Sequence, residues 1–219
     1  MHYAELSRAY NELTGPGGEF EIVKEEVLGN RIRTWKNAPP TVRDVWLATR
    51  EFADRDYLIY HDEKLTYEET HELTSAVANW LFAQGVKTGD RIAISMRNYP
   101  EWMIIYWACC SVGITVVGMN AWWTAEEMDY ALKDSEPAVL FLDSERLERV
   151  RQKPEMLNGA KLVGVRLEDY PDDVTPWSEV IAAGGDLPDV SVDPDSDACI
   201  FYTSGTTGQP KGVVRDNGG

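Results

Sequence analysis

The sequence is poor in the residues that build disulfide frameworks and metal centres. Its 219 residues include three cysteines and three histidines. Cys109 and Cys110 are adjacent within an apolar run and Cys199 stands alone, so the number is odd and no metal-ligand spacing is formed. This pattern predicts small buried thiols in a reducing compartment, and therefore a cytoplasmic protein.

Basic residues are also in short supply, and no long apolar run is uninterrupted. The chain has 37 acidic and 21 basic residues, and its net charge of -16 disfavours nucleic acid or an anionic membrane as a general partner. The N-terminus lacks a basic start followed by an apolar stretch, so no signal peptide is predicted. The most apolar segment, residues 102–119, is broken by Gly113 and rich in β-branched residues after it, which predicts a buried helix and a buried strand rather than a transmembrane segment.

The remaining composition is typical of a globular protein, with 43% hydrophobic and 26% charged residues. Residues 1–40 show no regular pattern and contain the turn-rich stretches TGPGGEF and KNAPPT. A regular pattern begins at residue 41. The sequence therefore predicts an irregular N-terminal segment, residues 1–40, followed by an α/β subdomain, residues 41–219.

Helical and strand patterns alternate in this second part. Thr66 with Glu69, and Thr124 with Glu127, have the spacing of capping boxes and predict two helix starts. Short apolar strands are expected near residues 91–96, 114–119, 138–143, 161–167 and 198–204. The alternation predicts an α/β fold with a mostly parallel sheet of five or more strands, flanked by helices on both faces. In such sheets, ligands bind at the carboxyl ends of the strands.

The loop that follows the last expected strand carries the clearest chemical signal, the sequence TSGTTGQPKG at residues 203–212. Its glycines allow the backbone to approach a ligand, its hydroxyls can donate to phosphate oxygens, and its lysine adds a positive charge. It is not a Walker loop, because Pro210 precedes Lys211 and Gly212 follows it. A hydroxyl-rich surface turn is the alternative. We predict phosphate binding by Thr203, Ser204, Gly205, Thr206, Thr207, Gly208 and Lys211.

The segment FYTSGTTGQPKGV, residues 201–213, resembles the phosphate-binding signature of the adenylate-forming, or AMP-binding, superfamily. The segments LTYEET, GDRIAISMRNYPEW and CCSVGITVVGMNAWWTAEEM are similar to upstream parts of the same family, so that the resemblance covers residues 40–213. RNYPEWMIIYWA is most similar to medium- and long-chain fatty acid–CoA ligases. The tail GVVRDNGG is more similar to acetyl- and propionyl-CoA synthetases, which leaves the acyl chain length open.

This resemblance implies the N-terminal subdomain of an adenylate-forming enzyme, an acyl-CoA synthetase that converts a carboxylic acid, with a fatty acid favoured, to an acyl-adenylate and then transfers it to coenzyme A. The implied cofactors are ATP, Mg²⁺ and coenzyme A, with Thr203 as a Mg²⁺ ligand. In the family the catalytic lysine lies further along the chain, so no catalytic residue is expected here. We expect the chain to be the first part of a longer ligase, truncated after the loop and inactive by itself.

Two alternatives to an enzyme fragment stay open. One is a free-standing nucleotide-binding or interaction module without adenylation activity, and the other is a scaffold in which the loop has no role. A truncated sheet would expose apolar surface, which predicts self-association into a homo-oligomer. Trp122 and Trp123 follow the second expected strand, where they either line an acyl entrance or pack a helix onto the sheet.

Overall fold

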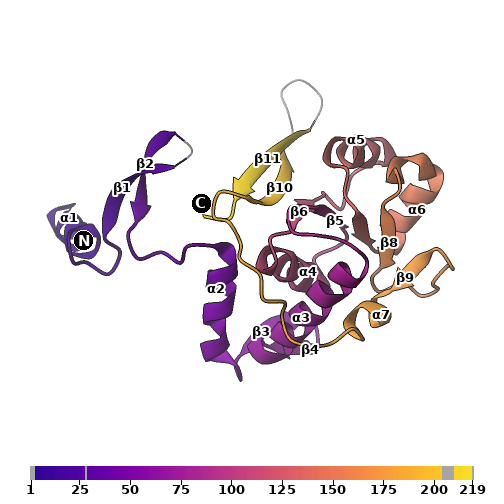
Figure 1. Ribbon diagram of the computed structural model, residues 1–219, viewed down its shortest axis with the longest axis horizontal. Coiled ribbons are helices and arrows are strands. Elements are labelled where there is room, and N and C mark those ends of the chain that lie inside the picture. Colours follow the sequence, from indigo (N-terminus) through magenta and orange to yellow (C-terminus); the bar gives the residue numbers. More distant parts are fainter. Residues whose placement is uncertain (1–2, 28, 204–209, 219) are drawn as a thin grey trace. The chain divides into compact units, whose positions relative to one another are not determined.

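The computed structural model describes residues 3–27, 29–203 and 210–218, and the chain divides into two compact units, Met1–Pro40 and Thr41–Gly219 (Figure 1). The first unit contains helix α1 (Tyr3–Thr14) and a hairpin of β1 (Ile22–Val27) and β2 (Asn30–Trp35). The prediction that residues 1–40 are irregular was therefore wrong. The hairpin strands are mostly charged and exposed, so they lack the alternation that marks a half-buried strand.

The second unit is built on a seven-stranded sheet with the strand order β11-β10-β6-β5-β7-β8-β9. Neighbouring strands are parallel except for β10 and β11, which form an antiparallel hairpin at one edge. The prediction of a mostly parallel sheet of five or more strands is confirmed. The strands are β5 (Arg91–Ser95), β6 (Thr115–Gly118), β7 (Val139–Leu142), β8 (Lys161–Gly164), β9 (Val174–Pro176), β10 (Asp197–Thr203) and β11 (Lys211–Asp216).

Helices cover both faces of this sheet (Figure 1). A separate hairpin of β3 (Asp56–Tyr60) and β4 (Glu63–Thr66) precedes the longest helix. The helical elements are α2 (Val42–Ala48), η1 (Thr49–Phe52), α3 (Tyr67–Ala83), α4 (Pro100–Ser111), α5 (Ala125–Ser135), α6 (Ser144–Gln152), η2 (Pro154–Leu157) and α7 (Trp177–Ile181). The capping boxes expected at the starts of α3 and α5 are both present.

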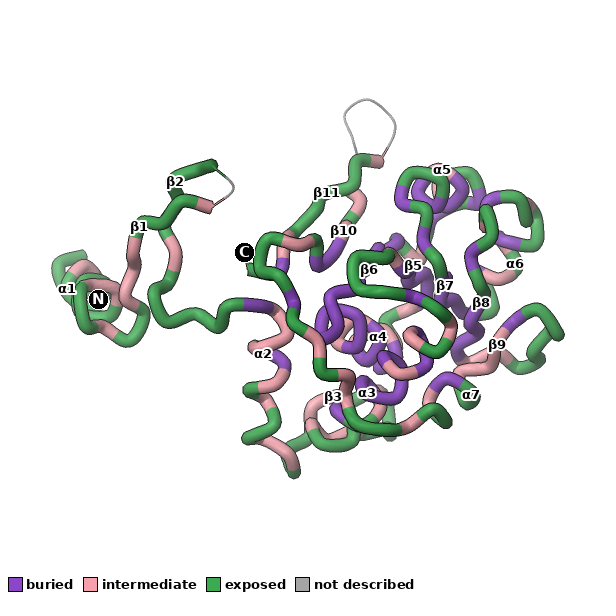
Figure 2. Tube along the Cα trace, viewed as in Figure 1, coloured by how far each residue is buried: buried purple, intermediate pink, exposed green. Residues whose placement is uncertain are grey.

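The core consists of two layers separated by the sheet. Ile92 and Ile94 on β5 point to the side of α3, α4 and α7, whereas Ala93 points to the side of α5 and α6. Figure 2 shows the buried segments gathered on the central strands and on the helices that pack against them. Because the strands are buried on both faces, they read in the sequence as continuous apolar runs.

The strand order reverses at β5. The connection through α4 leads from β5 to β6 on one side, and the connection through α5 then leads back across β5 to β7 on its other side. The loops that follow β5, β6, β7 and β10 all leave the sheet at its carboxyl edge, because these strands are parallel. This is the edge at which open α/β sheets bind ligands, next to the point where the strand order reverses.

Candidate functional site

The predicted phosphate-binding loop joins β10 to β11 at the carboxyl edge. Thr203 ends β10 and pairs with Lys211, which begins β11. Both residues are exposed, and the Thr203 hydroxyl lies 3.5 Å from the carbonyl oxygen of Lys211. No described residue pairs with the ammonium group of Lys211. The hairpin thus brings the two ends of the loop together, while Ser204, Gly205, Thr206, Thr207 and Gly208 lie outside the described residues.

A half-buried tyrosine, Tyr202, connects the end of β10 to α5. The hydroxyl of Tyr202 donates a hydrogen bond to Oδ2 of Asp134 at 2.6 Å. Burial of the ring, and secondly this hydrogen bond, raise the pKa of Tyr202, so the phenol stays protonated as a donor. The anchor fixes the strand that delivers Thr203 to the carboxyl edge.

The loop after β6 leaves the sheet next to the end of β10, where the predicted phosphate-binding loop begins. β6 and β10 are parallel neighbours, with Gly118 opposite Phe201. This is the last pair of the two strands, and Asn120 and Thr203 each follow it by two residues in the chain. The backbone of Gly118 lies against the Phe201 ring, since a Cβ atom at this position would be only 2.5 Å from it. The Phe201 ring in turn stacks on Trp102 of α4, with ring centroids 6.4 Å apart.

The two tryptophans in the β6–α5 loop have different surroundings. Trp123 is only 8% exposed and packs edge-to-face on Tyr202, with ring centroids 5.7 Å apart. Trp122 is 70% exposed, and the guanidinium of Arg97 lies 3.7 Å from its ring centroid. Trp123 therefore packs α5 and its loop onto the sheet, which agrees with the packing role considered for this pair. Trp122 instead presents an aromatic surface at the carboxyl edge.

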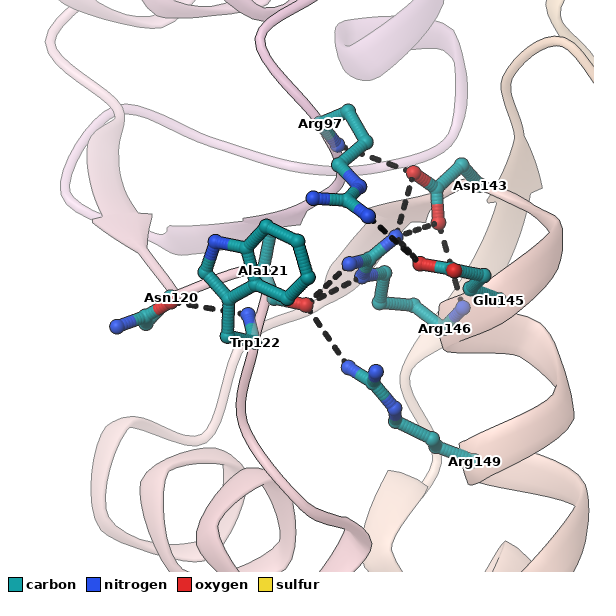
Figure 3. Close-up of polar contacts among 8 residues, drawn as sticks. All are labelled: Arg97, Asn120, Ala121, Trp122, Asp143, Glu145, Arg146 and Arg149. Carbon is teal, nitrogen blue, oxygen red and sulfur yellow. Dashed lines mark hydrogen bonds and ion pairs between the residues drawn. The ribbon is translucent and has the colours of Figure 1, made fainter.

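A buried ion pair lies beneath this loop, and nothing in the sequence analysis identified it (Figure 3). Asp143 follows β7 and caps α6, and the residue is 3% exposed. It accepts hydrogen bonds from the Arg146 guanidinium at 3.0 Å and from the backbone N–H of Arg97 at 3.0 Å. The residue Arg146 is 0% exposed. The available sequence signal was Asp143 after an expected strand, with Arg146 three residues later. This spacing is common on helices, so it does not indicate a buried ion pair.

The carbonyl oxygen of Ala121 is the second focus of this network. Arg146 donates to it through Nε at 2.8 Å and also through Nη2, and Arg149 donates through Nη1 at 2.8 Å. Figure 3 shows both arginines reaching from α6 to this one oxygen. The network therefore ties together the loops after β5, β6 and β7 through Arg97, Ala121 and Asp143.

Positively charged side chains lie near the carboxyl edge of the sheet. Arg97 lies in the loop after β5, Arg149 lies on α6 and Lys211 begins β11, although the chain as a whole is strongly acidic. The described part of the chain contains no group of three or more histidine, cysteine, aspartate or glutamate side chains able to hold a metal ion. Thr203 supplies one exposed hydroxyl, which fits Mg²⁺ that keeps water and phosphate oxygens as its other ligands.

The comparison with known protein families gives the class of protein. Residues 45–219 match the family of AMP-binding enzymes, and the chain belongs to this family. The resemblance seen in the loop and its upstream motifs is thereby confirmed, and the chain corresponds to an N-terminal portion of such enzymes. No helix within residues 3–27, 29–203 and 210–218 is long and apolar enough to cross a membrane.

Several proteins similar to this chain are CoA ligases. The chain is 34% identical over 154 residues to a feruloyl-CoA synthase of an Amycolatopsis species and 30% identical over 162 residues to the long-chain-fatty-acid–CoA ligase FadD13 of Mycobacterium tuberculosis. Each comparison covers 70% of this chain but only 28% and 30% of the relative. The chain thus spans less than a third of the length of these relatives.

The fold is also found in solved structures. The anthranilate CoA ligase AuaEII, solved with anthranoyl-AMP, superimposes with a TM-score of 0.77 over 82% of this chain and 36% of the ligase. The two sequences are 22% identical. This likeness supports the fold of the second unit as that of adenylate-forming enzymes.

Proposed function

We propose that the chain is the phosphate-binding part of an acid–thiol ligase, an AMP-forming acyl-CoA synthetase that uses ATP, Mg²⁺ and coenzyme A. The observation that supports this most directly is the placement of Thr203 and Lys211, which face each other at the carboxyl edge of the sheet. Family membership and the CoA ligases among the relatives support the same reaction. The protein acts in the cytoplasm on small molecules.

In the proposed reaction the carboxylate of the acid attacks the α-phosphorus of ATP, and the bond from this phosphorus to the pyrophosphate leaving group breaks. The thiol of coenzyme A then displaces AMP from the acyl-adenylate. Both the attacking carboxylate and the triphosphate are negative, so the site must supply compensating positive charge and hold the reactants in line. The loop from Thr203 to Lys211 binds the β- and γ-phosphates, with backbone N–H groups and hydroxyls as donors.

Lys211 acts as a charge clamp on the phosphates and neither donates nor accepts a proton in this proposal. When bound, Mg²⁺ shields the phosphate charges, and Thr203 offers it one oxygen ligand. The chain holds no residue that we assign to catalysis of acyl transfer. The isolated chain is therefore expected to bind nucleotide without completing the ligation.

We propose a fatty acid as the acid substrate, since the segment RNYPEWMIIYWA is similar to fatty acid–CoA ligases and FadD13 is among the relatives. A second candidate is an aromatic acid, which the 34% identity to a feruloyl-CoA synthase favours. The two are separated by measuring AMP formation by the protein in its full length from its source, with CoA, MgATP and either acids of two to sixteen carbons or ferulate.

Nucleotide binding tests the role of the loop. The dissociation constants of MgATP and AMP are measured by titration calorimetry for the wild type, Lys211→Ala and Lys87→Ala. Lys87 is a matched control, because it is an exposed lysine whose ammonium group has no partner among the described residues, and it lies before β5, at the amino edge. Loss of one charge-assisted contact predicts about tenfold weaker MgATP binding for Lys211→Ala, with AMP binding nearly unchanged.

Equal losses for MgATP and AMP would contradict the clamp on the β- and γ-phosphates. MgATP binding without AMP formation by the full-length protein would favour the alternative of a nucleotide-binding module. Absence of MgATP binding by the wild-type chain would reject the loop as a sufficient phosphate site.

A further inference from the structure

We infer that Arg146 is a positioning residue for the phosphate site. It holds the β6–α5 loop in place beside the loop that begins at Thr203. This inference rests on the proposed function, since it concerns the same phosphate site, but it assigns a role to a residue that does not contact the phosphates.

Acidic side chains of its own helix region fix the position of Arg146. Its guanidinium is fully buried and is paired with the carboxylate of Asp143, which caps the same helix, and Nη1 also pairs with Glu145 at 2.6 Å. A planar guanidinium held on one side in this way has its remaining N–H groups aimed in a fixed direction. Here that direction is the carbonyl oxygen of Ala121, 25 residues away in the sequence.

The carbonyl oxygen of Ala121 accepts several hydrogen bonds from arginine side chains. A carbonyl oxygen has two lone pairs, and in this structure N–H groups from Arg146 and Arg149 share them. Hydrogen bonds from charged donors are stronger than neutral ones. The loop closes locally as well, because Trp122 N–H donates to the side chain of Asn120 at 2.9 Å and Trp123 N–H donates to the carbonyl of Asn120 at 3.1 Å.

The β6–α5 loop and the proposed phosphate site follow neighbouring strands of the sheet. The parallel neighbours β6 and β10 end their pairing at Gly118 and Phe201, and Asn120 and Thr203 each follow this pair by two residues. Ala121, the next residue, is the one that Arg146 holds. A displacement of the β6–α5 loop would therefore also alter the position of Thr203, where the proposed phosphate-binding loop begins.

Stability alone does not account for such a pair. Removing two charges from water offsets most of the attraction between them, so buried ion pairs add little net stability compared with apolar side chains of similar volume. What the pair does supply is a fixed direction for the donors and a link to the N–H of Arg97 in the loop after β5. The three loops linked in this way surround the carboxyl edge where the strand order reverses.

The test uses the wild-type chain and the variants Arg146→Met, Arg149→Met and Arg151→Met. Arg149→Met removes one donor to Ala121 and leaves the buried pair intact. Arg151 is the matched control, because it lies on the same helix but pairs with Asp173 at the surface. Three quantities are measured: the dissociation constant of MgATP, the hydrogen-exchange rates of the Trp122 and Trp123 amides without nucleotide, and the unfolding temperature.

We expect Arg146→Met to raise the MgATP dissociation constant about tenfold, as is typical for loss of an outer supporting contact. Arg149→Met should raise it about threefold, with both amides exchanging faster in each variant and Arg151→Met unchanged. A purely structural role would lower the unfolding temperature of Arg146→Met without these effects in Arg149→Met.

Unchanged MgATP affinity and amide exchange in Arg149→Met would overturn the inference, and this variant decides the matter if Arg146→Met does not fold. Failure of the proposed function has a different signature, since the wild-type chain would then show no difference from Lys211→Ala in MgATP binding. That result would reject both the phosphate site and the positioning role of Arg146.

Discussion

The imidazole of His71 stacks on the indole of Trp46, with ring centroids 3.9 Å apart. Nε2 of His71 lies 3.0 Å from the hydroxyl of Thr49, and this hydroxyl donates its hydrogen to the carbonyl of Trp46 at 2.6 Å. The Thr49 oxygen therefore accepts from the histidine, which makes Nε2 the protonated nitrogen of a neutral ring. The contact links α2 to α3, and it is far along the chain from the loop that we propose binds phosphate.

This contact predicts a loss of stability in mild acid. Burial, and secondly the charge of Arg50, lower the pKa of His71 from 6.5 to about 4. Between these values the unfolded chain binds a proton that the folded chain does not, so the free energy of unfolding falls as the pH falls from 6.5 to 4. The slope from this one group is at most about 1.4 kcal/mol per pH unit.

Urea unfolding at pH 7, 6 and 5 measures this slope. The variant His71→Gln keeps a donor for Thr49 but does not titrate in this range, so its stability should vary less with pH than that of the wild type. The variant is also expected to be less stable at pH 7, because it loses the stacking on Trp46. Parallel pH dependences for the two proteins would show that His71 is not the group responsible.

The close contact of Gly118 with Phe201 predicts an effect of a single added methyl group. In Gly118→Ala the new Cβ would meet ring atoms of Phe201 at 2.5 and 2.7 Å, so the ring must move away from Trp102. Such crowding costs about 1–3 kcal/mol. Because Phe201 is partly exposed, the protein should still fold.

A double-mutant cycle with Phe201→Ala tests this explanation by urea unfolding. If the ring is the source of the crowding, Gly118→Ala should cost much less in the Phe201→Ala background than in the wild type. Additive losses in free energy would mean that the strain arises in the backbone of β6.

Arg166 joins the β3–β4 hairpin to α4, which predicts that its loss destabilises the second unit. Its guanidinium pairs with both carboxylate oxygens of Glu63, at 2.8 and 2.6 Å, and its Nε donates to the buried Glu101 at 2.9 Å. Arg166→Met leaves Glu101 buried without this partner, at a cost of about 1–3 kcal/mol in the free energy of unfolding.

Two further variants separate the contributions of this cluster. Arg166→Lys keeps the charge but cannot form the forked pair, so we expect it to recover only part of the loss. Glu63→Gln should have a smaller effect than Arg166→Met, because Glu63 is exposed and its pairing is screened by water. An equal loss in Glu63→Gln and Arg166→Met, measured by thermal unfolding, would contradict this order.

Much of the sheet could be predicted from the sequence, because its central strands are buried on both faces. The runs TVVG in β6 and VLFL in β7 are wholly buried, and such apolar runs between helical patterns indicate parallel strands. β11 was missed because its residues are exposed, including Val213 and Val214, and its pairing depends on the hairpin rather than on a buried face. The N-terminal helix and hairpin were missed since they bury no residue fully.

The candidate site could be predicted only where side chains carry the signal. The loop from Thr203 to Lys211 was recognisable because glycines, hydroxyls and a lysine are close together in the sequence. The network of Asp143, Arg146 and Ala121 was not, since its central acceptor is a backbone carbonyl and its three loops meet only through the strand order. Sequence patterns report local propensity and burial, and neither of these specifies the partner of a carbonyl oxygen.

The different surroundings of the adjacent Trp122 and Trp123 predict losses of stability of very different size from the same substitution. Trp123 is buried against Tyr202, so Trp123→Ala should cost about 3–5 kcal/mol in the free energy of unfolding. Trp122 is mostly exposed and contacts the guanidinium of Arg97, so Trp122→Ala should cost about 0.5–1 kcal/mol. Urea unfolding followed by far-UV circular dichroism measures both without relying on tryptophan fluorescence.

Trp122→Phe serves as the control for the contact with Arg97, because it keeps an aromatic ring with a weaker attraction for a cation. Its stability should lie between those of the wild type and Trp122→Ala, and raising the salt concentration should bring the three proteins closer together. A loss of several kcal/mol in Trp122→Ala would instead mean that Trp122 is buried in solution. Its ring would then belong to the core, as that of Trp123 does, and the carboxyl edge would not present an exposed aromatic surface.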